Sequence, residues 1–174
     1  LVMTYLNGGN GTIRFDGSAP QVITSTGGAL PNIVFDSTST IDLSNQTVRF
    51  AKKLTYINGS VITTNSIVKI GYSSWASDVT WDPGVIAFND VELLFESNGG
   101  THSFIVLGDM DINGDLTFNT LAGGSLETFA CGNILLAGDL NITNLNGGGV
   151  NLKLDGATDQ TITYTGGTPP EGLI

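Results

Sequence analysis

The chain carries one stretch of sequence twice, and this repetition limits the folds it can adopt. Residues 1–28 and 140–167 share 14 of 28 positions, including an Asp-Gly step that begins at Asp16 and again at Asp155. The substitutions keep residue character, since Arg14 becomes Lys153. We infer a unit of 139 residues, present once in full and followed by the start of a second. We expect the sequence to begin and end inside a repeat of a longer polypeptide.

A shorter period of 24 residues lies inside the long unit. Residues 114–118 read Gly-Asp-Leu-Thr-Phe, and residues 138–142 read Gly-Asp-Leu-Asn-Ile. The long unit divides into about six such steps, and a step of this size with two or three short strands is typical of one coil of a β-solenoid. A single coil cannot bury its inward face alone, so we expect the coils to stack around a continuous core.

Apolar and polar residues alternate along most of the chain, which predicts short strands. The 24 glycines and the low charged content of 13% disfavour helices. We predict an all-β fold, a parallel β-helix (β-solenoid) with coils of about 24 residues that spans 1–174, with a loop insertion at 72–83. Tandem β-sandwich repeats are the alternative. The residues expected to face inward are Ile13, Phe15, Ile33, Phe35, Leu116, Phe118, Leu140, Ile142, Leu152 and Leu154, and those expected to face outward are Arg14, Arg49, Glu127 and Lys153.

Two motifs resemble a known class of repeats. Residues 12–17, continued by Gln21-Val22-Ile23 and by residues 32–35, resemble the β-strand-rich repeats of very large bacterial surface proteins, common in Bacteroidetes. Residues 114–118 resemble the Gly-Asn-Leu-Thr-Ile coils of the same proteins, and phage fibre proteins have similar repeats. The resemblance implies a right-handed β-helix, export to the cell surface or assembly into a virion fibre, and a stalk or adhesin role without catalytic residues.

The charge balance argues against two classes of partner. The formal net charge is −10, with only six basic side chains. Such a surface repels phosphate backbones and anionic lipids, so we expect no nucleic-acid partner. No run of about 18 apolar residues is present, and we expect no membrane insertion.

Acidic and amide side chains alternate at one place in the sequence. Asp109, Asp111, Asn113 and Asp115 have the spacing by which a tight loop gathers oxygen ligands around calcium. The twelfth position of such a loop is Thr120, which cannot supply the usual bidentate carboxylate. The alternative is two strands joined by a turn. We expect the chain to bind no cofactor, with calcium at these residues as the alternative.

Three aromatic residues lie where the repeat is interrupted. Tyr72, Trp75 and Trp81 fall in the predicted insertion, and aromatic rings on a projecting loop can stack against sugar rings. The alternative is that these rings cover the core or a neighbouring chain, because aromatic side chains dominate the energetics of cores and interfaces.

Catalysis has little support in the sequence. His102 is the only histidine, so no site with several histidines can form. Asp16 and Asp155 have the residue type of a glycosidase acid and base, but an Asp-Gly step that recurs is better explained by turn chemistry. Together with the role that the resemblance implies, this leads us to expect a non-enzymatic stalk or filament segment of a secreted, adhesin-like surface protein, joined to copies of itself or to neighbouring repeats. The alternatives are a module that binds carbohydrate or a host surface, and a polysaccharide-cleaving β-helix enzyme.

Overall fold

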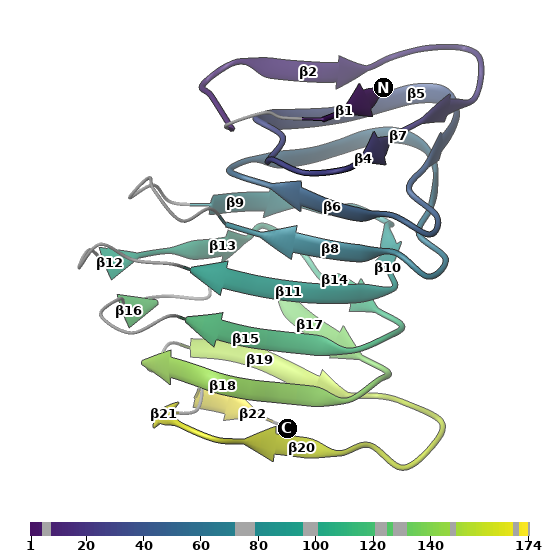
Figure 1. The fold of residues 1–174 in the computed structure, drawn as a ribbon. Coiled ribbons are helices and arrows are strands. Elements are labelled where there is room, and N and C mark those ends of the chain that lie inside the picture. Colours follow the sequence, from purple (N-terminus) through teal and green to yellow (C-terminus); the bar gives the residue numbers. More distant parts are fainter. Residues whose placement is uncertain are drawn as a thin grey trace.

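The protein is a stack of parallel strands that wind from the N-terminal end to the C-terminal end (Figure 1). Figure 1 shows the computed structural model of the chain. The described part contains strands and turns but no helix. The residues that the structure describes are 1–4, 8–71, 79–95, 101–120, 125–126, 132–146, 149–168 and 171–173.

One sheet runs along almost the whole stack. Its strands follow one another in sequence order, and each pairs in parallel with the strand one coil further on. Paired residues are separated by 20 to 25 residues, as between Thr47 and Ile67 or between Val91 and Leu116. The strands are β6 (Thr47–Phe50), β8 (Ile67–Ile70), β11 (Asp90–Phe95), β15 (Leu116–Thr120), β18 (Leu140–Asn146) and β20 (Ile162–Tyr164), with β21 (Gly167–Thr168) paired to β18.

Two further sheets form the other walls. The first contains β2 (Thr12–Phe15), β3 (Gln21–Val22), β5 (Asn32–Asp42), β7 (Leu54–Ile62), β9 (Val79–Asp82) and β13 (Phe104–Val106). The second contains β10 (Ala87–Phe88), β14 (Met110–Ile112), β17 (Asn133–Leu136), β19 (Gly149–Leu154) and β22 (Glu171–Leu173). Two short parallel pairs complete the pattern, β1 (Val2–Met3) with β4 (Thr24–Ser25) and β12 (Thr101–His102) with β16 (Ser125–Leu126).

These pairings confirm the predicted β-solenoid, which has about six turns. Strands β11, β15 and β18 point left at the front of Figure 1, β9 and β13 point right behind them, and the chain descends, which is the right-handed sense. Tandem sandwiches are excluded, because the paired strands of the described chain are all parallel and sandwiches are built from antiparallel hairpins.

The predicted register is confirmed along the described strands. All ten residues predicted to face inward are buried or packed against the core, with Ile13 and Leu154 partly buried. Arg14 faces outward and pairs with Asp36 of the next coil. Lys153 is exposed and Arg49 is half-buried, whereas Glu127 lies outside the described residues. Because side chains alternate along a strand, a slip by one residue would have reversed this pattern.

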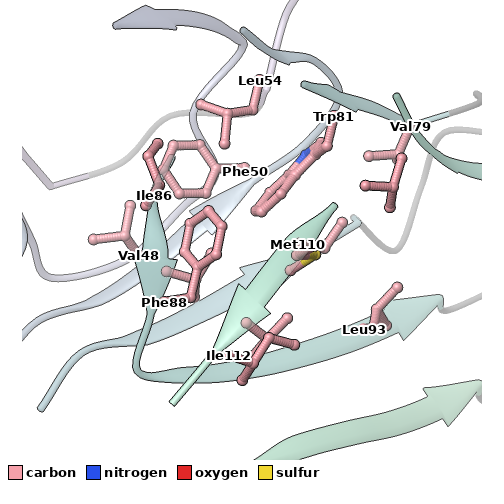
Figure 2. Packing of buried hydrophobic residues seen from close by; sticks show 14 of the residues in the cluster. Val48, Phe50, Leu54, Val79, Trp81, Ile86, Phe88, Leu93, Met110 and Ile112 are labelled. Carbon is pink, nitrogen blue, oxygen red and sulfur yellow. The ribbon is translucent and has the colours of Figure 1, made fainter. Parts of the chain in front are cut away.

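Aromatic rings form a continuous contact chain through the upper half of the core. Phe15, Phe35, Phe50 and Trp81 follow one another at ring-centroid distances of 5.5, 6.4 and 5.5 Å, with edge-to-face orientations. Phe88 and Phe104 then contact Trp81 at 5.4 and 6.1 Å. Figure 2 shows the Trp81 ring among Phe50, Phe88 and Met110 in the middle of this core.

The two copies of the repeated stretch share a strand pairing and a side-chain hydrogen bond. Val2 pairs with Thr24, and Asn141 pairs with Thr163, which are the equivalent residues 139 positions later. The Gly17 amide donates to Gln21 Oε1 at 3.3 Å, and the Gly156 amide donates to Gln160 Oε1 at 3.0 Å. The repetition in sequence is therefore a repetition of local backbone structure.

The predicted insertion at 72–83 is too long. Residues 79–82 form β9, which pairs with β7 and β13 and belongs to the regular wall of the solenoid. Residues 72–78 lie outside the described part of the chain.

Candidate functional site

The proposed sugar-stacking role of Trp81 is wrong. Its side chain is 0% exposed, and its ring packs against the rings of Phe50 and Phe88 in the core. Among the described residues the indole N–H has no hydrogen-bond partner, and the ring packs within the apolar core. Tyr72 and Trp75, the other two residues of this predicted site, lie outside the described residues.

The predicted calcium loop is not formed. Met110, Asp111 and Ile112 form β14, so Asp109 and Asp115 lie at opposite ends of a strand rather than in one turn. Asn113 lies between β14 and Asp115. No group of three or more acidic, histidine or cysteine side chains within the described ranges is arranged to hold a metal ion.

Two of the four predicted calcium ligands instead bind the next coil. Asp109 Oδ1 accepts hydrogen bonds from the backbone and side-chain nitrogens of Asn133 at 2.9 and 3.0 Å. Asp115 Oδ1 accepts the backbone N–H of Asp139 at 2.8 Å. These carboxylates supply acceptors to the neighbouring turn of the solenoid.

Asp115 belongs to a row of carboxylates, here called the aspartate ladder, that consists of Asp90, Asp115 and Asp139. The Asp115 amide donates to Asp90 Oδ1 at 3.0 Å, and the Thr161 amide donates to Asp139 Oδ1 at 2.8 Å. Each carboxylate therefore accepts the backbone N–H of the residue just before the next strand of the same sheet, one coil further on. The sequence showed the recurring Gly-Asp step, but the role of the carboxylate between coils was not predicted.

The glycine before two of these aspartates is required by close packing of the coils. A Cβ atom on Gly138 would lie 2.2 Å from the carbonyl oxygen of Gly114. A Cβ atom on Gly114 would lie 2.1 Å from Asp90 Oδ1. Any side chain at either position would push neighbouring coils apart and break the bond to the ladder.

Two other aspartates have shifted pKa values. Asp111 faces outward on β14, where shielding from water by neighbouring strands, and then repulsion from Asp155, raise the pKa of its carboxyl. Hydrogen bonds from the Ser44 hydroxyl and backbone N–H lower the pKa of Asp42. The hydrogen bond from the Ser44 backbone N–H to Asp42 Oδ1 is 2.8 Å long and closes the turn after β5.

The residues considered for catalysis do not come together. Asp16 follows β2 at the N-terminal end, and Asp155 follows β19 near the C-terminal end of the stack (Figure 1). His102 ends the short strand β12. The acid and base of a glycosidase flank one bond about 5 to 10 Å apart, so Asp16 and Asp155 cannot act as such a pair within one chain.

Three apolar residues of the first and last described coils are partly exposed. At the N-terminal end Leu1 is 46% exposed. At the C-terminal end Ile162 and Tyr164 of β20 are 45% and 47% exposed.

Comparison with protein-family models, with curated proteins and with solved structures found no match. In the described residues, no helix has both the length and the apolar character that crossing a membrane requires.

Proposed function

We propose that this chain is a structural segment of a stalk or filament in a large secreted surface protein. The observation that carries the proposal is the way each coil binds the next along all three walls. Parallel strand pairing, the aspartate ladder and a continuous apolar core all act along the same axis. In a solenoid each repeat contacts only its neighbours, so the pairing and the core continue in one direction, along which a stalk would carry load.

The partners that we propose are copies of the chain or neighbouring repeats, and the proposed location is the cell surface, with a virion fibre as the alternative. The repetition of 139 residues supports this proposal, because equivalent coils can follow one another in an extended array. The acidic composition, with a net charge of −10, keeps such arrays soluble.

A mechanical test addresses the stalk directly. The chain is tethered by residues 1 and 174 and stretched along the solenoid axis in optical tweezers. We expect its length to remain constant until one cooperative unfolding event. Gradual lengthening under low load would contradict a load-bearing role.

A glycan array tests the competing function on the same preparation. One outcome would favour a carbohydrate-binding module over the stalk. It is specific sugar binding that Trp75→Ala abolishes, together with gradual lengthening under load. An unchanged length with no sugar bound is the result that the stalk predicts.

A further inference from the structure

We propose that the Asn58-Gly59 step is a site of spontaneous covalent modification, at which the Asn58 side chain loses ammonia and becomes aspartate or isoaspartate. The inference does not depend on the proposed stalk function. It rests on the geometry of an irregular place in one wall of the solenoid. It also rests on a second Asn-Gly step, Asn113-Gly114, which the fold holds in a different way.

The register between β5 and β7 shifts on either side of Asn58. Asn58 lies opposite Asp36, and the next regular pair is Ser60 opposite Thr40. On the other edge of β7, the described pairing with β9 ends earlier in the strand. Among the described strands, Gly59 therefore has no partner in either ladder.

The amide of Gly59 instead contacts the side chain of the residue before it. Its N–H donates to Asn58 Oδ1 at 2.9 Å. Because Oδ1 is bonded to Cγ, this contact holds the carboxamide carbon beside the nitrogen that can attack it. Reactions within one molecule are fast when the reacting atoms are held about 3–3.5 Å apart. Gly59 also lacks a side chain that would hinder the approach, and Asn58 is exposed to water.

The reaction needs only water and hydroxide. The Gly59 amide loses its proton to hydroxide, and its nitrogen forms a bond to Asn58 Cγ. The bond from Cγ to the side-chain nitrogen breaks, and ammonia leaves with a proton taken from water. Water then opens the resulting cyclic imide at either carbonyl, which leaves aspartate or isoaspartate at position 58. Water is consumed, ammonia is released, and no oxidant or reductant is required.

The same two residues are protected at Asn113-Gly114. Asn113 is exposed, as Asn58 is, so water reaches both side chains. The Gly114 amide, however, donates to the Asn89 carbonyl of the preceding coil at 2.9 Å. This bond must break before the amide can lose its proton and its nitrogen can turn toward the side chain. The contact between coils therefore slows the reaction at Asn113, whereas the irregular ladder leaves Asn58 reactive.

Conversion places a negative charge in the wall of the solenoid. Asn58 lies opposite Asp36, which already forms an ion pair with Arg14. Like charges directly opposite on neighbouring strands are destabilising. Isoaspartate also lengthens the backbone beside Gly59, where a Cβ atom would lie only 2.8 Å from the carbonyl oxygen of Ser37. Modification should therefore weaken the contact between β5 and β7.

Peptide mapping by mass spectrometry measures the reaction at each asparagine. The full chain is incubated for several weeks at body temperature and mildly alkaline pH, and conversion is detected as a mass gain of about 1 Da. In the folded protein we expect Asn58 to convert about tenfold faster than Asn113, because the Gly114 amide must first break its hydrogen bond. In denaturant, where neither amide is held, the two sites should convert at similar rates.

Three results would overturn the proposal. The first is an equal or faster reaction at Asn113 in the folded protein. The second is a ratio of the two rates that stays the same in denaturant, because the neighbouring sequence rather than the fold would then cause it. The third is no conversion at Asn58 during a period in which the denatured chain reacts.

Two matched variants connect the reaction to its effect on the wall. Asn58→Gln lengthens the side chain, so that ring closure is slower, and Asn113→Gln is the control at an equally exposed site. After incubation we expect the wild type and Asn113→Gln to melt at a lower temperature than before, while Asn58→Gln is unchanged. Circular dichroism checks that both variants fold. An unchanged melting temperature in a wild type converted at Asn58 would overturn the predicted weakening of the wall.

Discussion

The backbone N–H of Asp139 donates a 2.8 Å hydrogen bond to the carboxylate of Asp115, its counterpart 24 residues earlier. An aspartate in this row can thus accept a hydrogen bond from the following coil through its carboxylate and donate one to the preceding coil through its backbone N–H. Asp115 does both, because its own N–H binds Asp90. The corner of the solenoid is therefore held by side chains as well as by the strand ladders.

Replacing Asp115 should weaken this corner. We expect Asp115→Ala to lower the free energy of unfolding by about 1 kcal/mol, since the Asp139 amide loses its acceptor at an exposed site. Asp115→Asn retains an oxygen at the same position and should lose about half as much or less. Chemical denaturation measures both. Equal losses for the two variants would show that the bond to Asp139 is not the source of the effect.

The glycine corners give a second test with an internal control. Gly138→Ala should destabilise the fold by about 1–3 kcal/mol, because the added methyl group overlaps the Gly114 carbonyl. Gly108→Ala is the control, since a Cβ atom there meets nothing within 4 Å. Thermal denaturation gives the melting temperature of each variant. Equal melting temperatures would contradict the close approach of Gly138 to the Gly114 carbonyl.

The aromatic chain should be energetically coupled. Phe50 and Trp81 meet edge to face at 5.5 Å inside the core. In a double-mutant cycle with Phe50→Leu and Trp81→Leu, we expect the double variant to lose about 1 kcal/mol less than the sum of the two single losses, because each single variant already removes the contact between the rings. A coupling near zero would mean that the two rings only fill space independently.

Asp111 predicts a pH dependence of known sign. Its raised pKa means that the charged carboxylate is less favourable in the folded state than in the unfolded state, so stability falls as pH rises through the range where Asp ionises. Asp111→Asn removes this loss. We expect the variant to be more stable than the wild type at pH 7, with a difference that vanishes below about pH 3.

Asp42→Asn is the control of opposite sign. The lowered pKa of Asp42 contributes stability above the pKa of the unfolded chain, and this contribution is lost as the pH falls through the folded value. Denaturation between pH 3 and pH 7 should therefore show the Asp42 variant losing stability relative to wild type as pH rises. If Asp111→Asn also lost stability relative to wild type as the pH rises, the pKa of Asp111 would not be raised in the folded protein.

The solenoid was predictable because its signals are local and repeat. Alternation at residues 12–15 fixed which side of the strand Phe15 occupies, and the recurrence at residues 114–118 and 138–142 gave the length of a coil. Each of these signals lies within a few residues, and the stacking of coils then follows from the need to bury the inward face.

The errors came from contacts between residues far apart in sequence. Alternating Asp109, Asp111 and Asp115 have the same spacing in a calcium loop and in a strand with two corners, and only the next coil decides between them. Trp81 looked like part of an insertion because residues 72–78 interrupt the pattern before it. The neighbours that bury it, Phe50 and Phe104, lie one coil away on either side.

The equivalence of successive corners has a consequence for how such a chain changes in length. Removal of residues 115–138 would join Gly114 directly to Asp139, restoring the same Gly-Asp step. Duplication of the same block would preserve it as well. Genetic deletion and duplication can therefore shorten or lengthen the molecule by whole coils without a misfit at the junction. The length of such a protein along the solenoid axis therefore changes in steps of one coil, each about one strand spacing of 4.8 Å.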